Sequence, residues 1–76
     1  MRELVELMVK SIVDEPEAAH VNEVAGESIV VYEVSVAEDD LGKVIGKGGR
    51  IANALRTIVK AAATRSDRKA TVEILS

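Results

Sequence analysis

The residues of this chain that could do chemistry are gathered in one glycine-rich, basic turn. Three glycines, Gly46, Gly48 and Gly49, stand among the cations Lys47 and Arg50. Glycine allows left-handed backbone conformations and lets another chain approach closely. Cations beside the free main-chain amides that open a helix attract anions. Because packing alone does not call for this composition between two apolar segments, the pattern predicts a phosphate cradle, and a phosphodiester chain is the ligand we expect.

Two nucleotide-binding motifs do not fit this turn. A Walker A loop follows the pattern G-x-x-x-x-G-K-[ST], whereas the segment from Gly42 to Gly48 is one residue short and lacks the hydroxyl that binds Mg²⁺. A dinucleotide fingerprint that starts at Gly46 requires a glycine where the chain has Ile51. Neither a Walker A nor a dinucleotide site is therefore predicted.

The composition excludes several other classes of site. The chain has no cysteine and a single histidine, His20, so it cannot form disulfides, thiolate metal sites or a histidine-based nucleophile pair. Its single aromatic residue, Tyr32, cannot supply an aromatic stacking platform for bases. No catalytic constellation can be assembled from this inventory. We therefore predict a protein that is not an enzyme and that uses no metal, cofactor or small-molecule substrate.

Charge is segregated along the chain, although the net charge is −3. Residues 1–40 carry two cations and eleven anions, and residues 41–76 carry eight cations and two anions. Between Leu41 and Ser66 there are six cations and no acid. This distribution allows a local anion-attracting face on an acidic protein. The alternative is a lysine-rich helix surface that serves solubility alone.

The elements that must position the turn follow from apolar periodicity. They are, in chain order, a helix over 2–13, a short strand over 20–25, a strand over 28–37, a short helix over 41–45, a longer helix over 49–64 and a closing strand over 71–74. In the second strand, Val30, Tyr32, Val34 and Val36 share one apolar face. The sequence therefore predicts an α+β fold of order α-β-β-α-α-β, with a small antiparallel sheet of three strands and three helices on one face.

The length bounds the size of the core. A chain of 76 residues is expected to form one domain whose core supplies only about 3–5 kcal/mol of net stability, so self-association would be useful. No apolar stretch approaches the roughly 18 residues of a membrane span. The N-terminus lacks the apolar region of a secretion signal. We expect a cytoplasmic protein with no membrane association.

The glycine turn resembles the Gly-x-x-Gly turn of KH domains, which joins two helices and is preceded here by Val44-Ile45 and followed by Arg50-Ile51. The additional helix and strand at the N-terminal side resemble the type II arrangement. The segments Asp40–Ile51, Ala54–Ala63 and Thr71–Ile74 resemble more closely the KhpA family, the small single-KH RNA-binding proteins of bacteria. The resemblance implies one KH domain over 1–76, with the N-terminal helix and first strand in 1–27 and the core KH motif in 28–76.

The resemblance also implies a site, a groove for about four unpaired nucleotides whose backbone runs over Gly46-Lys47-Gly48-Gly49. The bases would face an apolar floor formed by the short helix and the neighbouring strand edge. Val44 or Ile45 would contribute to this floor, or both would serve only as core. Arg50, Asn53 and Thr57 recur along the side of the long helix that adjoins the turn. The expected RNA-binding residues are Lys43, Ile45, Gly46, Lys47, Gly48, Gly49, Arg50 and Asn53.

The function implied by the resemblance is binding of single-stranded RNA with low sequence selectivity, as an RNA chaperone or post-transcriptional regulator. Similar proteins form homodimers and pair with a larger KH protein of the Jag or KhpB type. Gly48 departs from the family's commonest form, which has a polar residue such as Gln there, so weaker binding is expected. The rival interpretation is a KH-fold module for protein interaction or dimerisation with incidental RNA contact, favoured by the acidic first half, the scarcity of aromatics and Gly48.

Overall fold

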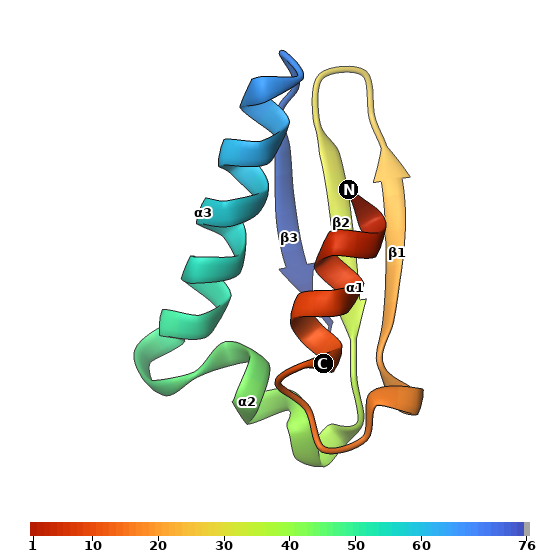
Figure 1. The fold of residues 1–76 in the computed structure, drawn as a ribbon, viewed down its shortest axis with the longest axis vertical. Helices are drawn as coiled ribbons and strands as arrows, with labels where there is room; N and C mark the ends of the chain where they lie inside the picture. The colour runs from red at the N-terminus through yellow and green to blue at the C-terminus, as the bar shows by residue number, and fades with distance from the viewer. Residues whose placement is uncertain (76) are drawn as a thin grey trace.

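A three-stranded sheet and three helices make up the fold, which a computed structural model describes for residues 1–75 (Figure 1). The elements are α1 (Arg2–Lys10), β1 (His20–Ala25), β2 (Val30–Ser35), α2 (Leu41–Ile45), α3 (Arg50–Arg65) and β3 (Ala70–Ile74). Single 3₁₀ turns lie at Pro16–Ala18, Glu38–Asp40 and Lys47–Gly49. The predicted α+β class and the order α-β-β-α-α-β are confirmed.

The sheet is mixed, which corrects the prediction of an antiparallel sheet. Its strand order is β1-β2-β3, with β1 antiparallel to β2 and β3 parallel to β2. The β1–β2 connection is a hairpin closed by a hydrogen bond from the Gly26 amide to the Ile29 carbonyl at 2.9 Å. The β2–β3 connection instead contains α2 and α3. This long crossover returns the chain to the end of the sheet where β2 began, so β3 runs in the same direction as β2.

The core lies between one face of the sheet and the two longer helices. Val30, Tyr32 and Val34 of β2 are buried and Val36 is half-buried, which confirms the predicted inward face. The helices contribute Val5 and Val9 from α1 and Ala52, Leu55, Val59 and Ala63 from α3. The α1 and α3 helices therefore occupy the same layer above the sheet. Within this core, burial of the Tyr32 hydroxyl and, as a smaller effect, the negative charge of Glu23 raise the pKa of Tyr32.

Two elements are shorter than predicted. The first helix ends at Lys10 rather than Val13, and a turn follows in which the Ile12 amide donates to the Val9 carbonyl at 3.0 Å, three residues back instead of four. Val13 nevertheless remains buried in the core, which explains why the apolar pattern continues beyond the helix. The second strand begins at Val30 rather than Ser28, because the preceding residues form the hairpin turn.

The glycine turn joins α2 to α3 at the end of the molecule opposite the β1–β2 hairpin (Figure 1). Contacts with α3 and the burial of Val44 attach the short helix α2 to the rest of the fold. The turn is thus held between two helices at one end of the helical layer. Within residues 1–75, no helix has both the length and the apolar character needed to cross a membrane.

Candidate nucleic-acid interface

The glycine turn has a backbone that favours glycine at three positions. Gly46, Gly48 and Gly49 have φ angles of 76°, 65° and 79°, a region that side chains with a Cβ rarely occupy. A Cβ on Gly46 would lie 2.4 Å from Ile51 Cγ1 and 2.8 Å from Ile51 N. A Cβ on Gly48 would have no neighbouring atom within 4 Å. Gly46 therefore lets the turn pack tightly onto α3, whereas Gly48 leaves its surface open.

Two backbone amides of this turn already donate hydrogen bonds to carbonyls of the turn itself. The amide of Gly49 donates to the Gly46 carbonyl at 3.1 Å, and the amide of Arg50 donates to the Lys47 carbonyl. The expectation of free amides where α3 begins is therefore wrong for these two residues. The amides of Lys47 and Gly48 precede the first of these bonds along the chain, so they are the ones that we expect to meet a ligand.

The cations around the turn fall into two groups. Lys47 and Arg50 are exposed, and no carboxylate in residues 1–75 forms an ion pair with either. Lys43 instead donates a hydrogen bond to Asp14, and its Nζ lies 3.6 Å from Asp40 Oδ1. The hydrogen bond to Asp14, assisted by the charges of both acids, raises the pKa of Lys43. Lys43 is thus charged but already paired with two carboxylates. A phosphate would have to compete with Asp14 and Asp40 for it.

Asp40 anchors the start of α2. The residue is 1% exposed, and its carboxylate accepts hydrogen bonds from the amides of Asp14 at 3.2 Å and Glu15 at 3.0 Å. Burial alone would raise the pKa of this carboxyl, but the two amide bonds and the Lys43 charge outweigh it and lower the pKa. The carboxylate therefore fastens the loop that follows α1 to the helix that precedes the glycine turn.

The two residues considered for the apolar floor, Val44 and Ile45, differ in burial. Val44 is fully buried in the core, whereas Ile45 is 38% exposed. Leu41 lies one helical turn before Ile45, on the same side of α2. It lines a cleft of about 410 Å³ together with Val36, Glu38 and Leu75. Leu41 and Leu75 were not among the predicted site residues, although the spacing of Leu41 and Ile45 was a signal that they share one side of α2.

The first half of α3 connects the turn to the free edge of the sheet. Asn53 Nδ2 lies 4.0 Å from the position of a Cβ on Gly49, and Asn53 Oδ1 accepts a hydrogen bond from Arg56 at 3.1 Å. The Nε of Arg56 donates to the Val72 carbonyl on the edge strand β3 at 3.1 Å. Arg56 was not predicted as a site residue. Its position three residues after Asn53 places both side chains on one side of the helix.

The predicted site residues therefore do not all stand together. The structure brings Gly46, Lys47, Gly48, Gly49 and Arg50 into one exposed turn, with Asn53 beside it and Ile45 before it. Lys43 is held instead by the carboxylates of Asp14 and Asp40. The turn thus offers two amides and two cations that have no ion-pair partner within residues 1–75, and the apolar cleft lies at the start of α2. Such a surface could hold a sugar-phosphate backbone while base faces rest on apolar side chains.

Comparisons with known proteins show relatives along nearly the whole chain. The family model "KhpA/KhpB, KH domain" matches residues 2–74. A protein of Clostridium perfringens named "RNA-binding protein KhpA" is 57% identical over 75 residues, which cover 99% of this chain and 100% of that protein. Proteins with the same name from Caldanaerobacter subterraneus and Chlamydia trachomatis are 51% and 43% identical over 75 residues, covering 99% of this chain and 100% and 96% of theirs.

A solved structure has the same fold. The crystal structure of Era from Aquifex aeolicus superimposes with a TM-score of 0.65 and 19% sequence identity. The match covers 95% of this chain and 28% of the Era chain. At this identity the likeness concerns the fold of one part of Era.

Proposed function

The chain belongs to the KhpA/KhpB family of KH domains, and we propose that it binds single-stranded RNA across the turn Gly46-Lys47-Gly48-Gly49. The observation that carries this proposal is the turn itself, in which three glycines at positive φ adjoin Lys47 and Arg50, two cations that form no ion pair with a carboxylate of residues 1–75. Relatives named RNA-binding proteins match the chain over its length, which supports RNA as the ligand. The protein in this proposal is a binding protein rather than an enzyme.

The strand would lie with its phosphates at the turn and its bases toward α2. Lys47 and Arg50 would contact phosphate oxygens, helped by the amides of Lys47 and Gly48. Leu41 would support base faces at the cleft that Leu75 also lines, and the exposed Ile45, one turn further along α2, would extend this support toward the glycine turn. Asn53, next to Gly49, would reach sugar or base edges. We place Lys43 at the margin of the groove, because Asp14 and Asp40 compete for its charge.

This arrangement favours low sequence selectivity. Contacts to phosphate and sugar fix the position of a strand but do not read its sequence. An apolar floor accepts the face of any base. We therefore propose a role as an RNA chaperone or post-transcriptional regulator that acts on many RNAs in the cytoplasm.

We further propose that the protein works as a dimer, either with itself or with a larger KH protein of the Jag or KhpB type. A domain of this size has a small core, so association would add stability. Two apolar side chains on the helices are strongly exposed, Leu7 at 65% and Ile58 at 45%, and they could be covered by a partner. Two linked grooves would also bind one RNA more tightly than either alone.

The same exposed side chains support a second candidate function, a protein-interaction module with incidental RNA contact. The acidic first half of the chain and Gly48 agree with it. The two candidates differ in which surface matters. RNA association depends on the turn in the first, and on no particular surface in the second.

The test is a double variant, Lys47→Asp with Gly48→Asp, which places two carboxylates on the turn. Both residues are exposed, and a side chain at Gly48 meets no atom within 4 Å, so the fold should persist. Aspartate is also among the side chains that tolerate a left-handed backbone. We expect binding of a short single-stranded RNA, followed by fluorescence anisotropy, to be lost while circular dichroism and oligomeric state are unchanged.

The matched control is Lys10→Asp with Ser28→Asp, which changes the net charge equally at exposed sites away from the turn. We expect it to retain RNA binding. If the turn variant binds RNA as well as the unmodified chain does, the groove assignment is wrong. If both variants lose the same RNA affinity, the overall charge and not the turn is responsible. If the turn variant loses only dimerisation, the interaction-module function is favoured.

A further inference from the structure

The exposed side of α3 carries a polar stripe that continues beyond the glycine turn. Asn53, Thr57, Lys60 and Thr64 follow one another at intervals of four, three and four residues and are all exposed. This spacing places them on one side of the helix. The opposite side, with Leu55 and Val59, packs into the core. No acidic residue occurs anywhere in α3, so an anion that follows this stripe from the turn meets no repelling charge on the helix.

The stripe ends at a basic cleft between the last part of α3 and the start of β3, which we call the α3–β3 cleft. It has a volume of about 470 Å³ and is lined by Ile29, Lys60, Thr64, Arg68, Lys69, Ala70 and Thr71. Three of these residues are cations and none is an acid. Within residues 1–75, none of the three cations forms an ion pair with a carboxylate.

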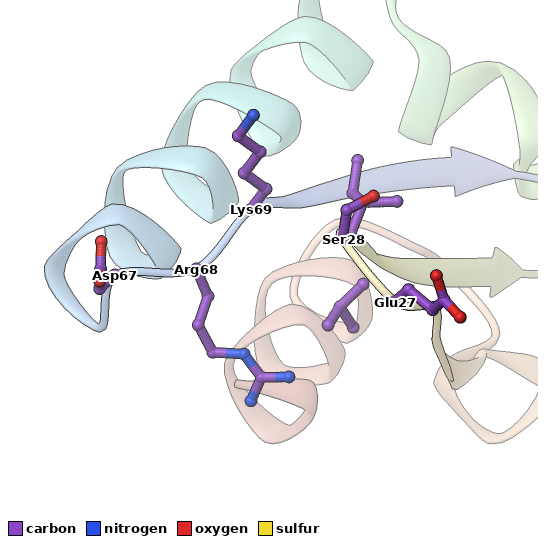
Figure 2. Close-up of a pocket in the computed structure, with 8 residues that line it drawn as sticks. Glu27, Ser28, Asp67, Arg68 and Lys69 are labelled. Carbon is purple, nitrogen blue, oxygen red and sulfur yellow. The ribbon is translucent and has the colours of Figure 1, made fainter.

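The charge of this cleft differs from that of its neighbour. The adjacent cavity, of about 310 Å³, includes Glu27 and Asp67 beside Arg68 and Lys69 (Figure 2). Figure 2 shows that the Arg68 and Lys69 side chains point to opposite sides of the chain, so the two charges are spread rather than stacked. The mixed cavity offers an anion both attraction and repulsion. The lining of the α3–β3 cleft contains no acid, so an anion in this cleft meets a net positive lining.

Within residues 1–75, the cations of the α3–β3 cleft have no acidic partner, although the chain has thirteen acidic residues. Lys60 and Lys69 both line this cleft, and a polyanion that enters it would offset the repulsion between their like charges. The ligand chemistry that fits both the cleft and the stripe is a phosphodiester chain.

We propose that the α3–β3 cleft is a second phosphate-binding subsite for the RNA strand that is held at the glycine turn, an inference that rests on the proposed function. From Arg50 to Lys60, α3 rises by about 15 Å. A strand that leaves the turn along the polar stripe reaches Lys60 and then Lys69 without crossing an acid of α3. RNA of about four nucleotides fills the groove at the turn, and only a longer strand reaches the cleft.

The experiment compares two lengths of oligouridylate, one of about four nucleotides and one about three times as long, on the double variant Lys60→Gln with Lys69→Gln. We expect the affinity for the short RNA to stay unchanged. The affinity for the long RNA should fall severalfold, and its log–log salt slope should become shallower by about 1.4, since each contact to a single strand contributes about 0.7. Each single variant should give about half of this change in slope.

The control variant, Arg2→Gln with Lys10→Gln, removes the same charge from α1 and should bind both lengths as the unmodified chain does. The proposal is overturned if the cleft variant binds the long RNA with unchanged affinity and slope, or if it loses affinity equally for both lengths. The two proposals fail separately. Loss of binding in the turn variant together with an unaffected cleft variant would refute the subsite alone, whereas RNA binding that survives the turn variant would refute the groove.

Discussion

Gly46 is the position in the turn where a side chain has no room. Its φ of 76° is unfavourable for other residues, and a Cβ would meet Ile51 at 2.4 Å. We therefore expect Gly46→Ala to lower the free energy of unfolding by about 1–3 kcal/mol from backbone strain, with a further loss from the contact with Ile51. Urea unfolding followed by circular dichroism measures the change.

Two other glycines provide controls for this prediction. Gly48 has a φ of 65° but open space around it, so Gly48→Ala should cost only the backbone term of about 1–2 kcal/mol. Gly42 lies within α2 with no neighbour within 4 Å and no positive φ, so Gly42→Ala should be neutral or stabilise by about 0.5–1 kcal/mol. Equal midpoints for the Gly46 and Gly42 variants would contradict this explanation.

Asp40 should make the stability of the fold depend on pH. Its pKa is lower in the folded protein than in the unfolded chain, because two amides and Lys43 stabilise the carboxylate more than burial destabilises it. A carboxyl with a lowered folded pKa contributes stability above its unfolded pKa, and this contribution is lost as the pH falls through the folded pKa.

The corresponding variant is Asp40→Asn, which keeps the shape of the side chain but removes its charge. We expect it to unfold at lower urea than the unmodified chain at pH 7, with the difference shrinking as the solution is acidified below the ordinary aspartate range. Glu38→Gln, an exposed acid in the same 3₁₀ turn, is the control. A difference that is constant from neutral to acid pH would show that the carboxylate charge is not responsible.

At this scale the sequence predicts what is local. The place of the glycines in a turn between two helices could be predicted, because it depends on their own backbone and on neighbours a few residues away. The roles of Asp40 and Lys43 could not be predicted, because both depend on Asp14, which is distant in sequence and meets them only in the folded chain. The burial of Val44 and the exposure of Ile45 likewise depend on how α2 sits against α3.

At the scale of elements, Arg56 connects α3 to the free edge of the sheet. Its Nε donates to the Val72 carbonyl, which belongs to an edge strand and has no strand partner on that side. Arg56→Lys keeps the charge but cannot reproduce this planar donor. We expect a loss of about 1 kcal/mol in unfolding free energy and faster amide hydrogen exchange in β3.

The control is Arg65→Lys near the end of the same helix, which should leave the exchange of β3 unchanged. Unchanged exchange at residues 70–75 in the Arg56 variant would mean that the contact does not hold the edge. The proposed RNA path from the turn to the α3–β3 cleft runs along the same helix. The variant therefore also measures how strongly this contact holds α3 against β3.

The existence of each helix and strand could be predicted from its apolar period, but the direction of β3 could not. The alternation from Thr71 to Ile74 is the same in a parallel and an antiparallel strand. The direction follows from the crossover through α2 and α3, which places Val30 opposite Ala70 and Val34 opposite Ile74. The end of α1 also escaped prediction, because Val13 belongs to the core without belonging to the helix.

At the scale of the whole molecule, the charge segregation seen in the sequence becomes a difference between faces. Glu33 of β2 stands beside Glu73 of β3 in the parallel register, and Asn22 of β1 donates to Glu33 at 3.2 Å. These residues alternate with the buried positions of their strands, so they lie on the face of the sheet away from the helices. An RNA should therefore be repelled from this face and drawn to α3 and the turn.

This division of charge predicts a modest salt dependence for a short RNA. Two to four phosphate contacts at the turn correspond to a log–log slope of affinity against salt of about −1.4 to −2.8 for a single strand. The value should lie near the shallow end, because Lys43 is shared with Asp14 and Asp40. Anisotropy titrations over a series of KCl concentrations give the slope. A slope near zero would mean that phosphate contacts do not hold the RNA.

The most direct test of the central claim is to map the binding surface of the unmodified protein by NMR. Amide shifts are followed while a short single-stranded RNA is added. The account predicts that the largest changes fall on residues 45–50 and on Asn53, with little change at Asn22, Glu33 and Glu73. Changes confined to the sheet face, with the amides of the glycine turn unmoved at saturating RNA, would contradict it.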